Sequence, residues 1–184
     1  MFEMSNGRPS SVQGRAEAEI RVYDFLDAQS IDYQTLLHPA AYTMEECRGV
    51  ELRLGAPVCK NLFLCNRQQS QFYLLMLPAC KHFKTKYLSA ELGCARLSFA
   101  DEEHMTALLG LHPGAVSPMG LVNDTEGMVT LVIDRDLLAS EFFGCHPCVN
   151  TATLRLRLAD LIDKLVPATG HACRVVTLRA DDAE

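Results

Sequence analysis

Residues 110–123 read GLHPGAVSPMGLVN, and the rest of the chain is organised around this stretch. It holds three glycines and two prolines. Glycine admits backbone conformations closed to other residues, while proline fixes φ and removes a donor, so we expect a stiff loop without a regular helix. The loop is long for a connector and is walled by apolar residues. It therefore indicates a small pocket whose polar contacts are backbone groups.

Length, composition and charge predict one globular domain. The 184 residues are 48% hydrophobic and 22% charged, which suits a soluble protein with a real core. Residues 1–13 are polar, with no segment of signal-peptide type, so we expect a cytoplasmic protein with no membrane contact. We expect a disordered start over 1–13, one domain over 14–179 and a frayed acidic tail over 180–184. The net charge of −6 argues against coating nucleic acid, but a local basic patch could still hold one acceptor end.

The hydrophobic patterns predict an α+β fold. Strands outnumber long helices and are joined mostly by turns, which favours a mixed, mainly antiparallel sheet flanked by helices. Thr43 and Glu46 have capping-box spacing, so a helix of about two turns should follow and end near Gly49. Pro167 should close the last helix. The predicted helices cover 14–29, 43–49, 81–92, 101–109 and 158–166, and the predicted strands cover 31–37, 58–65, 71–77, 95–99, 128–133, 142–143, 151–156 and 173–178.

A lysine interrupts one of the most apolar predicted strands. Residues 55–65 read GAPVCKNLFLC, and Val58 to Cys65 is apolar except for Lys60 and Asn61. Such a strand is typical of a sheet that is buried on both faces. A lysine inside it needs a partner or an anionic ligand, unless its side chain extends to the surface from the strand end. The residues leave both interpretations of Lys60 open.

One basic patch stands out in this acidic chain. Residues 81–86 read KHFKTK and hold three of its five lysines. A solvated helix face is the usual interpretation of such a run. Phosphate contact through Lys81, Lys84 and Lys86 is the alternative.

The Cys-His-Pro-Cys sequence at 145–148 invites a redox or zinc interpretation. A structural zinc site needs four ligands, and no second pair with suitable spacing exists, so we expect no metal. A thioredoxin-like pair begins a helix, whereas β-prone residues follow here, so the redox role is a minority hypothesis. We expect the eight cysteines to be buried reduced thiols. His146 is either a turn residue or a site residue.

No nucleophile elbow, Walker loop or dinucleotide fingerprint appears. The residues alone therefore indicate a pocket for a small anionic ligand and name no reaction. Four motifs taken together resemble the YbaK/ProX family, the aminoacyl-tRNA deacylases related to the editing domain of bacterial prolyl-tRNA synthetases. These motifs are KNLFL at 60–64, RLSFA at 96–100, PGAVSPMG at 113–120, and GCHP at 144–147 with Asn150. The resemblance covers about Ala16 to Leu178 and implies the editing-domain fold, with a partly barrel-like sheet.

The resemblance also implies roles for matching residues. Lys60 would hold the phosphate or ribose of the terminal adenosine, with Asn61 beside it. The glycine- and proline-bearing loop would bind the aminoacyl group and polarise the ester carbonyl, and His146 would shape a cavity sized for alanine. The implied catalytic set is Lys60, Asn61 and Gly114, and the implied substrate-binding set is Gly110, Pro113, Val116, Ser117 and His146.

The KNLFL and Gly-X-His-Pro forms look most like the freestanding branch that hydrolyses alanyl-tRNA-Pro. The implied function is trans-editing deacylation without a cofactor, with the acceptor end of tRNA-Pro as partner and prolyl-tRNA synthetase as a further candidate partner. One alternative is a family member with another specificity, such as cysteinyl-tRNA-Pro. Another is a sensor that binds an amino acid or aminoacyl-tRNA without hydrolysis. The group that activates water is not evident from the sequence.

Overall fold

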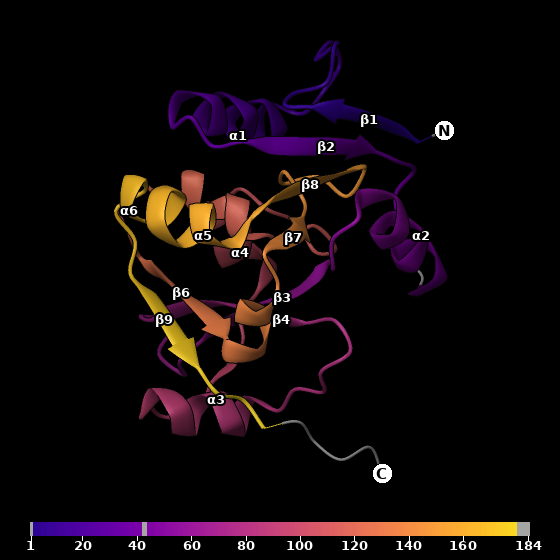
Figure 1. Ribbon diagram of the computed structural model, residues 1–184. Helices are drawn as coiled ribbons and strands as arrows, with labels where there is room; N and C mark the ends of the chain where they lie inside the picture. Colours follow the sequence, from indigo (N-terminus) through magenta and orange to yellow (C-terminus); the bar gives the residue numbers. More distant parts are fainter. Residues whose placement is uncertain (1, 42–43, 180–184) are drawn as a thin grey trace.

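The chain folds into two β-sheets with helices around them (Figure 1). The computed structural model describes residues 2–41 and 44–179. One sheet has the order β1-β2-β8-β7, and its pairings are antiparallel. The other has the order β5-β3-β4-β6-β9, in which β5, β3 and β4 pair antiparallel and β4, β6 and β9 pair parallel. The predicted α+β class with a mixed, mainly antiparallel arrangement is confirmed.

The strands of the first sheet are β1 (Glu3–Asn6), β2 (Tyr33–Leu37), β8 (Ala152–Arg157) and β7 (Phe142–Cys145). Those of the second are β5 (Ser98–Phe99), β3 (Cys59–Cys65), β4 (Phe72–Pro78), β6 (Val129–Asp134) and β9 (Cys173–Val176). The helices are α1 (Glu17–Ala28), α2 (Met44–Leu54), α3 (Thr85–Leu92), α4 (Glu102–Leu109), the 3-10 turns η1 (Pro118–Val122) and η2 (Arg135–Ala139), α5 (Leu158–Asp160), the π-helical turn η3 (Leu161–Leu165) and α6 (Val166–Ala168).

The two sheets meet at one point. Val58 and Gly144 form an isolated parallel bridge, and the Gly144 N–H donates to the Pro57 carbonyl at 2.8 Å. A Cβ at Gly144 would lie 2.7 Å from the Leu54 side chain and 3.0 Å from that of Val58, so a larger residue here would require these side chains to shift. In the described residues the sheets stay separate. They do not form the single, partly barrel-like sheet that we expected, because a bridge of one residue pair does not continue the ladder.

The five-stranded sheet is buried on both faces. Successive side chains of a strand point to opposite faces, and on β4 Leu74 and Met76 enter the main core while Leu75 and Leu77 enter a second core under α3. This double burial explains why β3 and β4 read as near-continuous apolar runs.

Residues 3–8, part of the segment over 1–13 for which we expected disorder, contact β2 and α1. β1 pairs with β2 in antiparallel register, and the Gly7 N–H donates to the Tyr33 carbonyl at 2.8 Å. Arg8 forms ion pairs with Asp24 and Asp27 of α1. Three of the four residues of β1 are polar, and the fourth, Met4, is exposed. The segment is held by main-chain pairing at a sheet edge, which leaves no hydrophobic pattern in the sequence.

Three helix predictions differ from the structure. The 110–123 stretch is not free of helix, because Ser117 caps the 3-10 turn η1 by accepting from the Met119 N–H at 3.2 Å. α2 continues beyond Gly49 to Leu54. Pro167 lies within the last helix, at the start of α6, where a missing N–H is tolerated.

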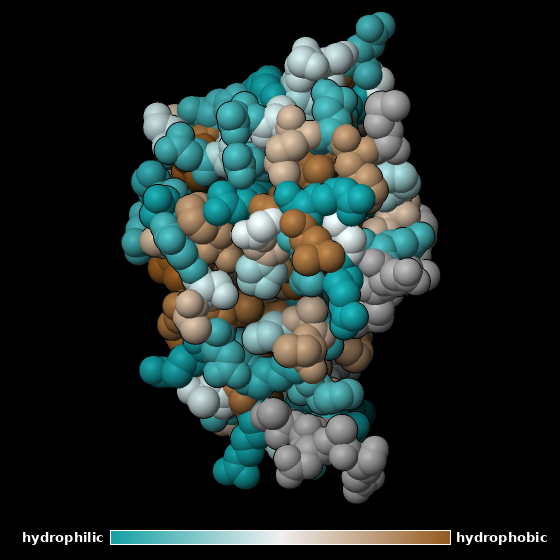
Figure 2. Space-filling model, turned by 45° about the vertical axis from the view of Figure 1, so that its right-hand side comes forward, coloured by the Kyte–Doolittle hydropathy of each residue, from teal (hydrophilic) through white to brown (hydrophobic). Residues whose placement is uncertain are grey.

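Two other expectations fall on residues that the structure does not describe: the Thr43 cap and the acidic tail over 180–184. Of the helices in the described ranges, none combines the length and hydropathy that a bilayer crossing requires. Apolar and hydrophilic side chains are interspersed over the face seen in Figure 2.

Candidate active site

Lys60 and Asn61 lie near the start of β3, and both side chains are half-buried. The Lys60 ammonium donates to the main-chain carbonyl of Lys81 at 3.0 Å. An ammonium has three donors, so this contact fixes one of them and leaves capacity for an anionic or hydroxyl-bearing ligand. The side chain is therefore held by a protein acceptor, which is the kind of partner that the sequence left open for a lysine inside this strand.

Asn61 connects β3 to the 110–117 loop. Its Nδ2 donates to the Val116 carbonyl at 3.1 Å. A carbonyl can only accept, so this contact fixes the orientation of the amide. The Asn61 Oδ1 atom is then a buried acceptor, and it has no partner among the described residues. A buried polar atom without a partner is costly, so a donor from water or a ligand is expected at this position.

Two glycines with positive φ shape the 110–117 loop. Gly110 has φ +62° and ends α4, and a Cβ there would lie 3.0 Å from the Asn123 amide nitrogen. Gly114 has φ +89° and lies in an exposed turn beside the exposed Pro113. Both positions disfavour side chains. The loop thus brings its main chain past the Asn61 amide.

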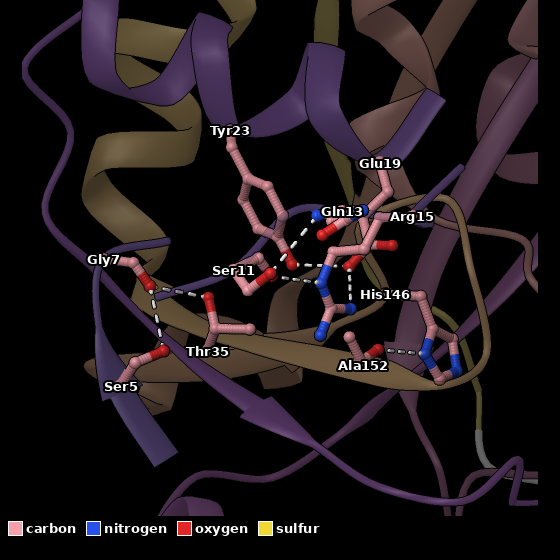
Figure 3. Close-up of polar contacts among 10 residues, drawn as sticks. All are labelled: Ser5, Gly7, Ser11, Gln13, Arg15, Glu19, Tyr23, Thr35, His146 and Ala152. Atoms are coloured by element: carbon pink, nitrogen blue, oxygen red, sulfur yellow. Dashed lines mark hydrogen bonds and ion pairs between the residues drawn. The ribbon is translucent and has the colours of Figure 1, made fainter. Parts of the chain in front are cut away.

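Ser117 and His146 join this loop to the β7–β8 connection. The buried Ser117 hydroxyl donates to the main-chain carbonyl of His146. The His146 ring places Nδ1 3.0 Å from the Ala152 carbonyl (Figure 3). Because that carbonyl only accepts, Nδ1 carries the proton and Nε2 of the neutral ring is an acceptor.

The pKa of His146 is lowered from its ordinary value. Burial is the main cause, the Ala152 carbonyl opposes it, and the nearby His38 lowers it further. A histidine titrates near pH 6.5 when unperturbed. The imidazole of His146 is therefore neutral at pH 7, and it presents an acceptor rather than a positive charge.

His38 is a candidate residue that the sequence analysis missed. Its ring centroid lies 6.4 Å from that of His146, and it is 5% exposed. Its ring nitrogens contact the Pro39 carbonyl at 2.7 Å and the Thr153 hydroxyl at 2.8 Å. In sequence His38 precedes a proline at a strand end and looks like a turn residue. Only the pairing of β2 with β8 places it beside His146.

A buried polar network lies on α1 and the residues just before it. Glu19 is 2% exposed, and its Oε1 accepts from Arg15 at 2.8 Å and from the Tyr23 hydroxyl at 2.7 Å. Burial and the bond to Glu19 raise the pKa of Tyr23. Figure 3 draws this network together with His146 and Ala152. Glu19 is a buried carboxylate with two partners, which is typical of a structural group.

The three lysines of the basic patch have different surroundings. Lys81 is buried, and its ammonium lies 2.7 Å from both Asp134 Oδ2 and Asp136 Oδ2. It is therefore occupied inside the protein, contrary to the suggestion that it contacts RNA. Lys84 and Lys86 are exposed around the start of α3, and the Lys86 ammonium lies 4.9 Å from the Tyr87 ring centroid.

The cysteines of the Cys-His-Pro-Cys sequence are free, buried thiols. Burial raises the pKa of Cys148 to about 12 and also raises the pKa of Cys145. A thiol with a raised pKa is a poor nucleophile. Of the eight cysteines that we expected to be buried, these two and Cys59 and Cys65 are buried, whereas Cys80 is exposed.

Hydrogen bonds link Asn61, the glycine-bearing loop and the connection that carries His146, whereas Lys60 extends from the other face of β3 toward Lys81. Such groups can bind an anion, orient water and stabilise developing negative charge. They contain no activated nucleophile of the kind that covalent catalysis needs.

Comparison with known proteins identifies the class. Residues 38–164 match the model of the aminoacyl-tRNA editing domain. The chain belongs to this family, which confirms the resemblance seen in its motifs. The match begins at His38, so β1, α1 and β2 precede the matched region.

Two individual relatives are similar to this chain over most of its length. The chain is 33% identical over 162 residues to the prolyl-tRNA editing protein ProX of Acetoanaerobium sticklandii, covering 88% of this chain and 98% of that protein. It is also 33% identical over 150 residues to prolyl-tRNA synthetase associated domain-containing protein 1 of Danio rerio, covering 80% of each.

A solved structure shares the fold. A crystal structure described as "a putative trans-editing enzyme for prolyl tRNA synthetase" superposes with a TM-score of 0.68 at 20% identity, covering 89% of this chain and 98% of that one. At this identity the likeness concerns the fold alone.

Proposed function

We propose that this protein is a trans-editing deacylase that hydrolyses the ester of mischarged tRNA-Pro, with alanyl-tRNA-Pro as its substrate. Family membership and the likeness to a prolyl-tRNA editing protein support the reaction class. The observation that carries the proposal is the unsatisfied Asn61 Oδ1, on an amide that is hydrogen-bonded to the 110–117 loop. It is a buried acceptor, and an attacking water could satisfy it.

The proposed roles follow from the chemistry of each group. Lys60 binds the phosphate or ribose of the terminal adenosine through its remaining donors. Asn61 Oδ1 accepts a hydrogen bond from the attacking water, and the Gly114 N–H stabilises the oxyanion as water adds to the ester carbonyl. The bond between the carbonyl carbon and the ribose oxygen then breaks, and that oxygen takes up a proton. The products are free alanine and tRNA.

Selection for alanine would come from the size of the aminoacyl pocket. Gly110, Pro113, Val116, Ser117 and His146 form the proposed substrate-binding set. The hydrogen bond from Ser117 to His146 holds two sides of this set together, and a rigid wall can reject the larger proline by clash. The neutral Nε2 of His146 adds an acceptor for a donor on the substrate.

The acceptor end of tRNA-Pro is the proposed partner, with prolyl-tRNA synthetase as a further candidate. Lys84 and Lys86 are the remaining lysines of the basic patch that could contact phosphate. If they do, the affinity for tRNA should fall as salt rises, and the Lys84→Ala/Lys86→Ala double variant should show a shallower salt dependence. If the salt dependence of tRNA affinity did not change in this variant, Lys84 and Lys86 would not be phosphate contacts.

Deacylation assays test the proposal directly. Alanyl-, cysteinyl- and prolyl-tRNA-Pro are compared with the wild type, Lys60→Ala and Lys164→Ala, an exposed lysine that pairs with Asp160. We expect rapid loss of alanine alone, a fall of about 100-fold in Lys60→Ala, and no change in Lys164→Ala. Hydrolysis of another ester would change the specificity but keep the site. Binding without hydrolysis of any ester would support a sensor and contradict the enzyme.

A further inference from the structure

Lys60 depends on the main chain of a second lysine. Its ammonium donates to the Lys81 carbonyl at 3.0 Å. Lys60 pairs with Leu77 on β4, and just after β4 a turn closes where the Lys81 N–H donates to the Pro78 carbonyl at 3.0 Å. The acceptor that orients Lys60 therefore lies on a turn rather than on the sheet itself. Something other than ladder pairing must hold that turn in place.

The Lys81 side chain provides such an anchor. Its ammonium lies 2.7 Å from Asp134 Oδ2 and 2.7 Å from Asp136 Oδ2, at the end of β6, the parallel neighbour of β4. The Lys81 side chain is 6% exposed and that of Asp134 is 0% exposed. We call Lys81, Asp134 and Asp136 the Lys81 cluster.

The cluster sets one ammonium between two carboxylates, an arrangement that makes it persistent. Burial lowers the pKa of Lys81, but its hydrogen bonds to Asp134 and Asp136 outweigh this effect and the pKa is raised overall. Asp134 is fixed from its other oxygen as well, because Oδ1 accepts from the Asp136 N–H at 3.1 Å. Taking one partner from a buried pair leaves the other charge uncompensated, so the turn carrying Lys81 stays attached to β6.

We propose that the Lys81 cluster is a positioning device for Lys60, in which Asp134 and Asp136 hold the Lys81 main chain so that its carbonyl keeps the Lys60 ammonium in one orientation. This inference rests on the proposed function, in which Lys60 binds the substrate. A lysine side chain is flexible, and fixing it before the substrate arrives removes an ordering cost from the reaction. Lys81, Asp134 and Asp136 are positioning residues here and need not contact the substrate.

Charge-removing variants of the cluster test the device. Asp134→Asn removes the charge and keeps an oxygen that can still accept from the Asp136 N–H. Asp136→Asn is gentler, since this side chain is 60% exposed and its loss leaves the buried pair intact. Lys81→Arg should retain both ion pairs and serve as the conservative rescue of Lys81→Met. Asp160→Asn, which breaks the exposed pair with Lys164, is the matched control.

The first measurement is kcat/KM for alanyl-tRNA-Pro. We expect a fall of about tenfold in Asp134→Asn and Lys81→Met and about threefold in Asp136→Asn, because a small misplacement of a binding group is costly. Lys81→Arg should stay within about twofold of the wild type, as should Asp160→Asn. Equal activity in Asp136→Asn and Asp160→Asn would contradict the proposal that the Lys81 cluster positions Lys60, even if Asp134→Asn failed to fold.

The second measurement follows Lys60 without any substrate. In protein labelled with ¹⁵N-lysine, the Lys60 ammonium signal is assigned with Lys60→Arg, and its proton exchange with water is compared among the folded variants. We expect faster exchange at Lys60 in Asp134→Asn and Asp136→Asn and no change in Asp160→Asn. Unchanged exchange in both aspartate variants would overturn the inference. If the wild type hydrolysed no ester, the proposed function would fail while this measurement still decided whether the cluster orients Lys60.

Discussion

Lys60 lies on β3 and Lys81 lies on the turn that follows the neighbouring strand β4, yet the protein treats their charges differently. Lys60 is half-buried and its ammonium contacts a neutral carbonyl at 3.0 Å. Lys81 is buried and its ammonium is neutralised by Asp134 and Asp136. Lys81 looked like the RNA-contacting residue because it opens a basic run. The structure leaves Lys60 with donors to spare and gives Lys81 two carboxylates.

The comparison teaches that the partner, more than the burial, indicates the role of a lysine. A buried cation that is already matched by carboxylates is costly to break but has no charge left for a ligand. A half-buried cation that meets only a carbonyl keeps its net charge for an incoming anion. The predictions below separate these two situations, from the largest expected effect to the smallest.

Lys81→Met should destabilise the fold strongly, because it leaves the fully buried Asp134 without its counter-ion. We expect a loss of about 3–5 kcal/mol in the free energy of unfolding, against less than about 1 kcal/mol for Lys60→Met. Urea unfolding at pH 7 measures both. Equal losses in the two variants would remove the distinction between the lysines.

Asn61→Ala should impair the reaction more than the fold, because it removes both the contact to the Val116 carbonyl and the unsatisfied Oδ1. We expect deacylation to fall by about 100-fold, the usual scale for one polar group aimed at a transition state. Single-turnover assays measure the rate. Asn6→Ala, which deletes an exposed amide on β1, is the matched control and should leave the rate unchanged.

Acid should weaken the fold through His146. Its pKa is lowered in the folded protein, so below about pH 6.5 the unfolded chain binds a proton that the folded chain resists. This part of the stability is complete above that pH and is lost as the pH falls. Thermal unfolding from pH 7 to pH 5 should therefore show a declining midpoint.

Two histidine variants test whether His146 causes the decline of the unfolding midpoint at low pH. His146→Gln should make the decline shallower, because glutamine does not titrate. His112→Gln, at a side chain that is 72% exposed, should leave it unchanged. A slope that is the same in His146→Gln and the wild type would contradict the assignment of this pH dependence to His146.

Cys148→Ser should have the smallest effect on the reaction. The thiol is buried and its pKa is raised to about 12, so it is neither a thiolate nor a ligand at neutral pH. We expect deacylation within about twofold of the wild type, with a modest loss of stability from burying a hydroxyl. Loss of activity in a folded Cys148→Ser protein would instead favour a thiol-dependent function.

Local signals in the sequence were sufficient to predict much of the secondary structure. The apolar runs of β3 and β4 were predicted because both faces of their sheet are buried, and alternation or apolar content placed most other strands to within a few residues. Gly93 ends α3 in the left-handed conformation, and Asp101 caps α4 by accepting from the His104 N–H. These are short-range effects, which residue type and spacing determine directly.

The family could also be identified from the sequence, because its motifs are short, ordered and carried by the residues themselves. The contacts of those residues could not be identified from the sequence. β1 adds to a sheet through main-chain pairing that leaves no side-chain pattern, and His38 meets His146 only because β2 lies beside β8. The counter-ions of Lys81 come from more than 50 residues away, at the end of β6. Charge and hydrogen bonding depend on distance in space, so the sequence by itself determined which groups are present, and only the tertiary structure decided which of them remain available to a ligand.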